Sequence, residues 1–193
     1  MPLTAPNTIE SDRLRVRIVA ESDLPALLRV NSDEEVLKHL PYPIWNSMTD
    51  ADAWYQRMLG IQSTGSALQF ALIEKRSALA VGTCLLFRFE EASARAELGF
   101  VLGRPHWGLG YMREALTAII DSAFDNMSLR RLEAEVNPRN QPSRKLLERL
   151  GFVKEGLLRQ RWVTRGEAYD VEVFGLLRHE WRHRALPTRS ADP

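Results

Sequence analysis

Apolar and polar residues alternate in several segments of the chain, which is the pattern of half-buried strands. The clearest segment is DRLRVRI at 12–18, where leucine, valine and isoleucine alternate with arginines. Further segments of strand character, at 68–74, 79–89 and 95–103, follow one another with only short polar turns between them. Short turns favour antiparallel pairing. The pattern therefore predicts an N-terminal strand and, further along, an antiparallel meander.

Two helices are expected between the first strand and the meander. Ser22 or Asp23 is a suitable N-cap for a short helix. Thr49, with Asp52 three residues later, approximates a capping box at the start of a second helix. The segment between them, 37–46, contains two prolines and two aromatic residues and is predicted to be an irregular loop.

Helices and strands alternate after the meander. Apolar residues at helical spacing run from Met112 to Met127 and predict a long amphipathic helix. The remaining elements are expected to be a strand at 130–136, a helix at 138–150 capped by Gly151, and a hairpin of strands at 156–163 and 169–177. This order predicts an α+β fold, a mixed, mostly antiparallel twisted sheet of about seven strands with about four helices on its faces.

The composition is that of an ordinary globular chain. Of the 193 residues, 45% are hydrophobic and 26% are charged. At roughly 100 to 200 residues per domain, this length suits one core. We expect a single domain over residues 1–193, with its core at about 10–182 and short flexible tails at both ends.

Charge and cysteine content limit the partners and the compartment. Lys plus Arg number 26 and Asp plus Glu number 25, so neither a nucleic acid nor an anionic membrane is an expected partner. The single cysteine, Cys84, can form no internal disulfide. No apolar run approaches the roughly 18 residues of a spanning helix, and the N-terminus lacks a signal-peptide pattern. We therefore expect a soluble, cytoplasmic protein.

The segment HWGLGYM at 106–112 links a predicted strand to the long helix. Gly108 and Gly110 would let the backbone approach a phosphate, while unpaired N–H groups and the dipole of the helix start attract an anion. The alternative is that both glycines only make a tight turn. The full dinucleotide fingerprint is absent because Glu114 stands in the region of its third glycine. No Walker-type Gly-Lys-Ser/Thr follows.

A carboxylate and two motifs together carry a family resemblance. Alternation in the strand 95–103 places Glu97 on the face opposite the apolar residues. Glu97, the segment 106–112 and NPRNQPSRKLLERLGF at 137–152 resemble the GNAT superfamily of acetyl-CoA-dependent N-acetyltransferases, over about residues 10–182. The likeness is greatest to the RimJ/RimL-like branch, which acetylates the N-termini of ribosomal proteins. The resemblance implies a GNAT fold, acetyl-CoA as cosubstrate, no metal, and direct acetyl transfer to a primary amine.

The resemblance also implies a set of coenzyme-binding residues. The backbone of 106–112 would hold the pyrophosphate, although the first position of the family's loop motif falls on Pro105 instead of Gln or Arg. Asn137 and Asn140 match positions that contact the pantetheine arm, with helix capping as the alternative for Asn140. The implied set is Phe100, Val101, Leu102, His106, Trp107, Gly108, Leu109, Gly110, Tyr111, Met112, Asn137, Asn140 and Ser143.

Two catalytic roles follow from the same resemblance. Glu97 matches the acidic strand position that serves as general base, the alternative being a solvated glutamate at a strand edge. Many members place a Tyr where this chain has Leu147. Ser143, one turn earlier, could instead donate to the departing sulfur, or be an ordinary first-turn serine. Backbone N–H groups from Gly99 to Val101 would stabilise the oxyanion, each by about 3 to 4 kcal/mol.

Other motifs are expected to be structural. HEWRH at 179–183 matches the zinc motif His-Glu-x-x-His with Glu180 as base, but no third ligand follows other than Asp192, and we expect no metal. Cys84 is expected to be a small buried hydrophobe. The C-terminal arginines expected to form a solvated patch, or to touch RNA or an acidic partner, are Arg178, Arg182, Arg184 and Arg189.

The acceptor is the least determined part of the prediction. Tyr42, Trp45 and Trp107 either line an acceptor groove or pack as ordinary large aromatics. We expect the acceptor to be the N-terminal α-amine of a protein or peptide. The alternatives are a small-molecule amine, such as an antibiotic or polyamine, and a non-catalytic acyl-CoA-binding module. The oligomeric state is open, with a homodimer among the alternatives.

Overall fold

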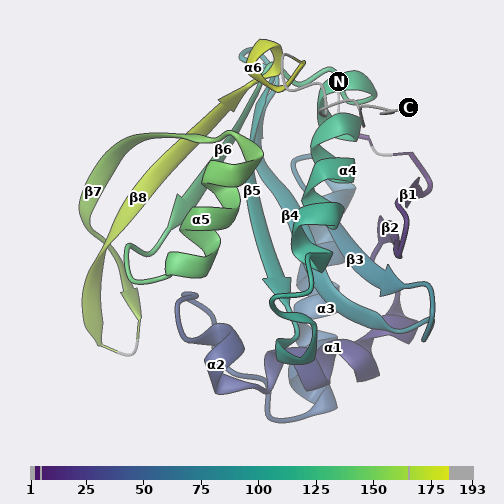
Figure 1. The fold of residues 1–193 in the computed structure, drawn as a ribbon. Coiled ribbons are helices and arrows are strands. Elements are labelled where there is room, and N and C mark those ends of the chain that lie inside the picture. Colours follow the sequence, from purple (N-terminus) through teal and green to yellow (C-terminus); the bar gives the residue numbers. More distant parts are fainter. Residues whose placement is uncertain (1–2, 5, 165, 183–193) are drawn as a thin grey trace, which may run out of the picture.

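Eight strands form one sheet in the order β1-β2-β3-β4-β5-β6-β8-β7 (Figure 1). The computed structural model describes residues 3–4, 6–164 and 166–182. The strands are β1 (Ile9–Glu10), β2 (Leu14–Ile18), β3 (Leu68–Glu74), β4 (Ala80–Glu90), β5 (Arg95–Leu102), β6 (Arg131–Val136), β7 (Val153–Thr164) and β8 (Glu167–Leu177). Neighbouring strands are antiparallel except β5 and β6, which are parallel. The sheet is therefore mixed and mostly antiparallel, as predicted.

Helices lie on both faces of this sheet. They are α1 (Leu24–Asn31), α2 (Glu34–Leu37), α3 (Met48–Ser63), α4 (Tyr111–Asp125), α5 (Gln141–Leu150) and α6 (Arg178–Arg182), with short 3₁₀ turns at Glu21–Asp23 and Arg104–His106. In Figure 1, α4 and α5 lie in front of the sheet, whereas α1 and α3 lie behind it. This α+β arrangement confirms the predicted fold class.

Strand β3 is covered by helices on both faces of the sheet. Phe70 and Leu72 pack with the α4 and α5 residues in the larger core cluster, whereas Ala71 and Ile73 pack with α1 and α3. Every residue of β3 is buried. A strand covered on both faces shows a nearly continuous apolar run, because neither face needs polar residues.

The stripe predicted for the long helix is buried on α4. Its members Met112, Leu116, Ile119, Ile120 and Ala123 are each at most 6% exposed. The following helix, α5, ends at Gly151 with φ of 91°, as the glycine C-cap predicts. The amphipathic pattern therefore predicted both helices, although α4 ends at Asp125, before Met127, and α5 begins at Gln141, later than expected.

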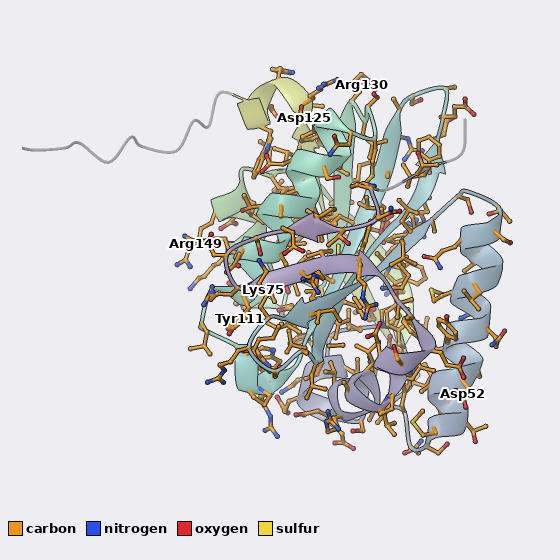
Figure 2. All side chains as sticks on the ribbon, turned by 90° about the vertical axis from the view of Figure 1, so that its right-hand side faces the viewer. Asp52, Lys75, Tyr111, Asp125, Arg130 and Arg149 are labelled. Atoms are coloured by element: carbon orange, nitrogen blue, oxygen red, sulfur yellow. The ribbon has the colours of Figure 1, made fainter. Side chains whose placement is uncertain are left out.

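The start of α3 differs from the prediction. Its N-cap is Ser47, and Asp50 accepts from the Ser47 backbone N–H at 3.0 Å. Thr49 and Asp52, which were expected to form the capping box, lie inside the helix; Asp52 is labelled on it in Figure 2. Both pairs have the spacing of a capping box, but only Ser47 has the extended backbone of a cap. The helix therefore begins earlier than expected.

Short elements were not predicted. Strand β1 pairs with β2 through only two residues, and α2 and α6 are four and five residues long. Segments of this length show no measurable periodicity. The hairpin was predicted correctly, although β7 begins at Val153 and β8 at Glu167, both earlier than expected.

The parallel strands β5 and β6 pair over only three positions, Arg95–Arg131 to Glu97–Glu133. Both strands continue beyond this point, and they separate in the direction of α2 (Figure 1). We call residues 98–102 of β5 and 134–136 of β6 the splay. Within it, the edge of β5 that faces β6 has no strand partner, so its backbone groups are available to a ligand except the Leu102 carbonyl, which accepts from Trp107 Nε1 at 2.7 Å.

Candidate active site

Glu97 lies where the splay begins. It is the last residue of β5 paired with β6, and it is 7% exposed. Its neighbours Ala96 and Leu98 belong to the apolar core on the other face. Glu97 is therefore a buried residue on a strand that is paired on both sides, and not the solvated glutamate at a strand edge that was the alternative.

Two acidic residues share one arginine on the Glu97 face. Arg88 Nη1 donates to Glu97 Oε2 at 2.6 Å and to Glu135 Oε1 at 3.2 Å. Trp162 Nε1 donates to the other Glu135 oxygen at 2.7 Å. Burial raises the pKa of Glu97 above its usual value, against the lowering effect of Arg88 and with a smaller raising effect of Glu135. A buried carboxylate with a raised pKa suits proton acceptance.

The loop before α4 has the backbone geometry of an anion site. Gly108 and Gly110 have φ of 72° and 81°, and a Cβ added at Gly108 would meet no atom within 4 Å. Among the described residues, no hydrogen bond is found from the backbone N–H groups of 108–113. Six successive free donors at the start of a 15-residue helix provide a positive site for phosphate oxygens. These features fit a coenzyme pyrophosphate.

Arg13 joins this loop to α4 and to β2. Its Nη1 donates to the Leu109 carbonyl at 2.9 Å, and its Nε donates to Glu114 Oε2 at 2.6 Å. The guanidinium carbon also lies 4.3 Å from the centre of the Tyr111 ring. The loop is therefore held from outside by the Arg13 side chain, whose charge is paired with the Glu114 carboxylate.

The other predicted loop residues occupy distinct environments. Trp107 and Leu109 are exposed, with Trp107 Nε1 donating to the Leu102 carbonyl at 2.7 Å. The Tyr111 hydroxyl donates to Glu74 at 2.6 Å, on the side of the molecule shown in Figure 2. Met112 points into the core, so only its backbone faces the loop.

The His106 ring packs edge-on against Tyr111, with 5.4 Å between centroids. Its buried Nδ1 has no hydrogen-bond partner within the described part of the chain. Arg104, the neighbour of Pro105, is 2.8 Å from Asp33 through its Nε, and this pairing takes it away from the role of a phosphate ligand.

The second predicted motif begins directly after β6. Asn137 Oδ1 accepts from the Arg139 N–H at 2.9 Å, and Asn140 Oδ1 accepts from the Ser143 N–H at 3.2 Å as the N-cap of α5. The capping alternative for Asn140 is thus observed. Ser143 enters the cap through its backbone, and its half-buried hydroxyl is not used there.

Leu147 is fully buried one turn further along α5 and belongs to the core. The position where the family resemblance implied a tyrosine therefore carries no proton donor. Phe100, Val101 and Leu102 are half-buried and lie in the splay, as does the backbone of Gly99. The backbone of the α4 loop, the splay and the start of α5 thus remain the candidate coenzyme contacts, whereas the Met112 side chain and the Tyr111 hydroxyl have partners within the protein.

The three aromatic residues considered for an acceptor groove lie in different parts of the structure. Trp45 is 7% exposed and packs against Trp54 in the α1–α3 cluster. Trp107 belongs to the α4 loop. Tyr42 lies in the segment between α2 and α3 and is 49% exposed; desolvation of its hydroxyl, with a smaller effect of the Glu97 charge, raises its pKa.

The competing motifs have structural partners. Glu180 accepts from the Leu177 N–H at 2.9 Å at the start of the short helix α6. His183 and Asp192 lie outside the described residues, and no group of three metal-binding side chains occurs among those described. Burial raises the pKa of the Cys84 thiol, which makes it unreactive.

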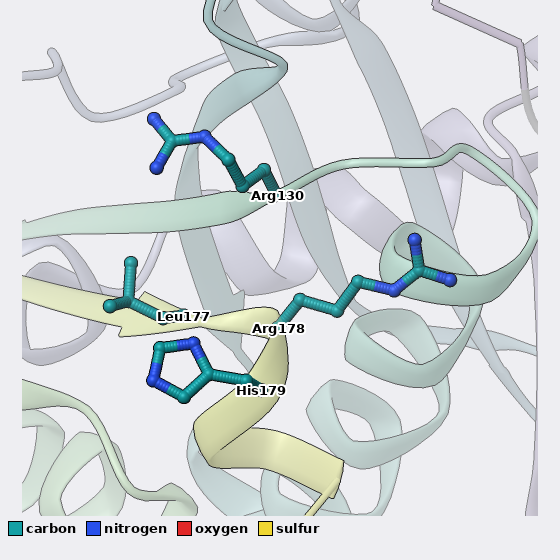
Figure 3. Close-up of a pocket in the computed structure, with 4 residues that line it drawn as sticks. All are labelled: Arg130, Leu177, Arg178 and His179. Atoms are coloured by element: carbon teal, nitrogen blue, oxygen red, sulfur yellow. The ribbon is translucent and has the colours of Figure 1, made fainter.

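A surface hollow at the other end of the sheet is lined by Arg130, Leu177, Arg178 and His179 (Figure 3). None of the candidate site residues lines it. Of the expected basic patch, Arg178 lies 3.6 Å from Asp125, and Arg184 and Arg189 are outside the described residues. In the part of the chain that the structure covers, no helix combines the length and apolar character needed to cross a membrane.

Sequence reasoning missed three residues of the site. Arg13 was seen only as a polar position of an alternating strand, and Arg88 and Glu135 only as strand residues. No local pattern identifies them, because their partners are far apart along the chain. Their pairing depends on the sheet order.

Comparisons with known proteins agree with this geometry. The family model described as "Acetyltransferase (GNAT) domain" matches residues 13–153. An uncharacterized N-acetyltransferase, p20, of Bacillus licheniformis is 37% identical, covering 90% of this chain and 98% of the relative. The ribosomal protein uS5 alanine N-acetyltransferase of Escherichia coli is 30% identical, and the match covers 90% of this chain and 92% of the relative. A crystal structure of a GCN5-related N-acetyltransferase from Brucella melitensis superposes with a TM-score of 0.82 at 26% identity, over 94% and 84% of the chains.

Sheet order, splay and loop define the class, an N-acetyltransferase with a GNAT fold. The chain belongs to the GNAT acetyltransferase family, as the sequence resemblance implied.

Proposed function

We propose that this protein transfers the acetyl group of acetyl-CoA directly to the N-terminal α-amine of a protein or peptide. The observation that carries the proposal is the splay. It has free N–H donors of residues 108–113 at one end and the buried carboxylate of Glu97 where its strands meet. One region thus combines an anion site, an unpaired strand edge and a base.

The chain's residues would divide the coenzyme between them. The backbone of 106–112 binds the pyrophosphate, and Asn137, Asn140 and the free edge of residues 98–102 bind the pantetheine arm. When bound, acetyl-CoA supplies an activated thioester. Backbone N–H groups near Gly99 to Val101 stabilise the oxyanion that forms on the thioester carbonyl.

Proton transfers complete the reaction. Glu97 accepts a proton from the acceptor ammonium, directly or through water, which frees the nitrogen lone pair to form the N–C bond. As the C–S bond breaks, the Ser143 hydroxyl donates a hydrogen bond to the sulfur, and the second proton lost by the acceptor nitrogen passes to the thiolate. The products are the N-acetylated amine and CoA thiol, and no metal takes part.

The acceptor class rests on proton affinity and on a relative. An α-amino group with a pKa of about 7.7 to 8.0 is substantially neutral near pH 7.5, whereas lysine at about 10.4 is nearly all charged. Lysine would require close to 4 kcal/mol more deprotonating power, at about 1.36 kcal/mol per pKa unit. Glu97 is one modest base, and Leu147 gives no assistance to the leaving group. The E. coli relative is named for acetylation of an alanine.

The test is acetylation of short peptides by mass spectrometry, with free or blocked N-termini and with or without an internal lysine. We expect free N-termini to react whether or not lysine is present. Equal reaction of blocked, lysine-containing peptides would contradict the α-amine assignment. Reaction of spermidine alone would point to a small-molecule amine, and no transfer to any amine, with CoA still bound, to a binding module.

A further inference from the structure

We propose that the Arg88 guanidinium occupies the position of the acceptor ammonium, as an internal stand-in that the acceptor displaces. This inference rests on the proposed function in one respect, that the substrate is an amine. It concerns the residue that determines how readily a cationic acceptor enters the site.

The position of Arg88 Nη1 has the chemistry of an ammonium site. Two carboxylates accept from it, Glu97 at 2.6 Å and Glu135 at 3.2 Å. The rings of Phe87 and Trp162 lie 5.5 and 5.7 Å from the guanidinium carbon. Carboxylates and aromatic faces around one point are a recognised environment for organic cations.

A backbone irregularity brings Arg88 there. The register of β4 against β5 shifts between Phe87 and Glu90, and Arg88 has φ of 50°. In a regular strand, Arg88 would point to the face opposite that of Phe87 and its partner Glu97. The bulge turns the side chain onto the Glu97 face instead. A left-handed conformation at a non-glycine residue costs free energy, which suits a position with a functional role.

The side chain can leave without unfolding its surroundings. Arg88 is 39% exposed, whereas Glu97 beneath it is 9% exposed by side chain. An ammonium that replaced the guanidinium would restore the charge pairing of Glu97 while Arg88 turned into solvent, and Glu135 would keep Arg161 at 3.4 Å as a second partner. Because Arg88 is part of the chain, it competes with the acceptor at a high effective concentration.

Binding of methylguanidinium chloride, measured by calorimetry at constant ionic strength, tests the vacated position without requiring catalysis. We expect methylguanidinium to bind to the Arg88→Ala variant but not to wild type. The double variant Arg88→Ala with Glu97→Gln should not bind it. The matched control is Arg95→Ala, because Arg95 is 36% exposed and pairs with Glu133 at 2.9 Å on the same strand as Glu97. Arg88→Gly, which suits the positive φ, replaces Arg88→Ala if that variant folds poorly. Equal methylguanidinium affinity in all variants would overturn the proposal.

Peptide acetylation supplies the second readout. In Arg88→Ala the KM for a free-N-terminus peptide should fall by about tenfold, and methylguanidinium should raise it again as a competitive inhibitor. A fall in kcat that methylguanidinium restores would instead make Arg88 a permanent positioning residue, which overturns the stand-in. If CoA does not change the melting temperature of the wild-type protein, the proposed function is contradicted. The binding of methylguanidinium would still decide the role of Arg88.

Discussion

A carboxylate as buried as Glu97 needs a compensating partner, since an unpaired buried charge is strongly destabilising. Arg88 supplies it, at 2.6 Å. The pKa of Glu97 nevertheless stays above its usual value, because burial is the largest influence on it. A carboxylate with a raised pKa is a stronger base than an exposed one, which suits a residue that must accept a proton.

Replacing Glu97 by Gln should lower kcat by roughly 10² to 10⁴, the range for losing a general base, without weakening CoA binding. In wild type, kcat/KM should rise with pH as Glu97 ionises, at a pH above 4.5, and the variant should lose this limb. Initial rates across pH measure both effects. Glu133→Gln is the control, because Glu133 pairs in register with Glu97 on β6. Full turnover in Glu97→Gln would remove Glu97 from the mechanism.

Ser143→Ala should reduce kcat by about tenfold, the effect of one hydrogen bond of about 1.4 kcal/mol made in the transition state. The KM for acetyl-CoA should not change, because the Ser143 backbone makes the α5 cap. Single-turnover kinetics would measure the chemical step. Gln141→Ala, an exposed change in the same helical turn, should be silent. Unchanged kcat in Ser143→Ala would reduce Ser143 to a structural serine.

At the scale of elements, the α4 loop tests whether free backbone N–H groups bind the coenzyme. CoA at 100 times its dissociation constant should add about 2.7 kcal/mol to wild-type stability and raise the melting temperature. Gly110→Val should abolish this rise by blocking approach to the backbone. Its control is Gly166→Val, between β7 and β8, because both glycines have φ of 81° and a side chain strains each by about 1 to 2 kcal/mol. Equal CoA-induced shifts in the two variants would refute the loop assignment.

Arg13 makes a separate prediction for the same element. Arg13→Met removes the side-chain contacts with Leu109 and Glu114 and keeps the backbone N–H bond to Glu114, so the loop loses its tie at Leu109 and CoA affinity should fall several-fold. Arg15→Met is the control, since Arg15 lies on the same strand and pairs with the exposed Glu10. Calorimetric titration with CoA compares them. Equal affinities in both variants would show that the loop is rigid without Arg13.

At the scale of the whole molecule, the sheet separates two tasks. One face is apolar and packs against α4 and α5, and this packing fixes the loop and the start of α5. The other face is covered by α1 and α3 over β3 and β4, and carries Arg95, Glu97, Glu133 and Glu135 beyond them. The splay connects the two faces, so a thioester from one side can meet an amine from the other.

The sequence predicted what depends on local periodicity. The α4 stripe, the glycine cap of α5 and the order of the main strands follow from patterns a few residues long. It missed features set by distant pairing. The two-residue β1 exists because Ile9 meets Val16, and Arg88 reaches Glu97 because β4 bulges. Alternation along β5 predicted that Glu97 lies on the face opposite the apolar residues. Its burial could not be predicted, because it depends on residues of neighbouring strands that are distant in the sequence.

The most direct measurement of the central claim is a crystal structure with CoA bound. We predict that the pyrophosphate contacts the N–H groups of 108–113 and that the pantetheine arm lies in the splay. The sulfur should lie within about 3.5 Å of the Ser143 hydroxyl, with Glu97 facing it from the acceptor side. CoA bound outside the splay, or a sulfur remote from Glu97, would contradict the account.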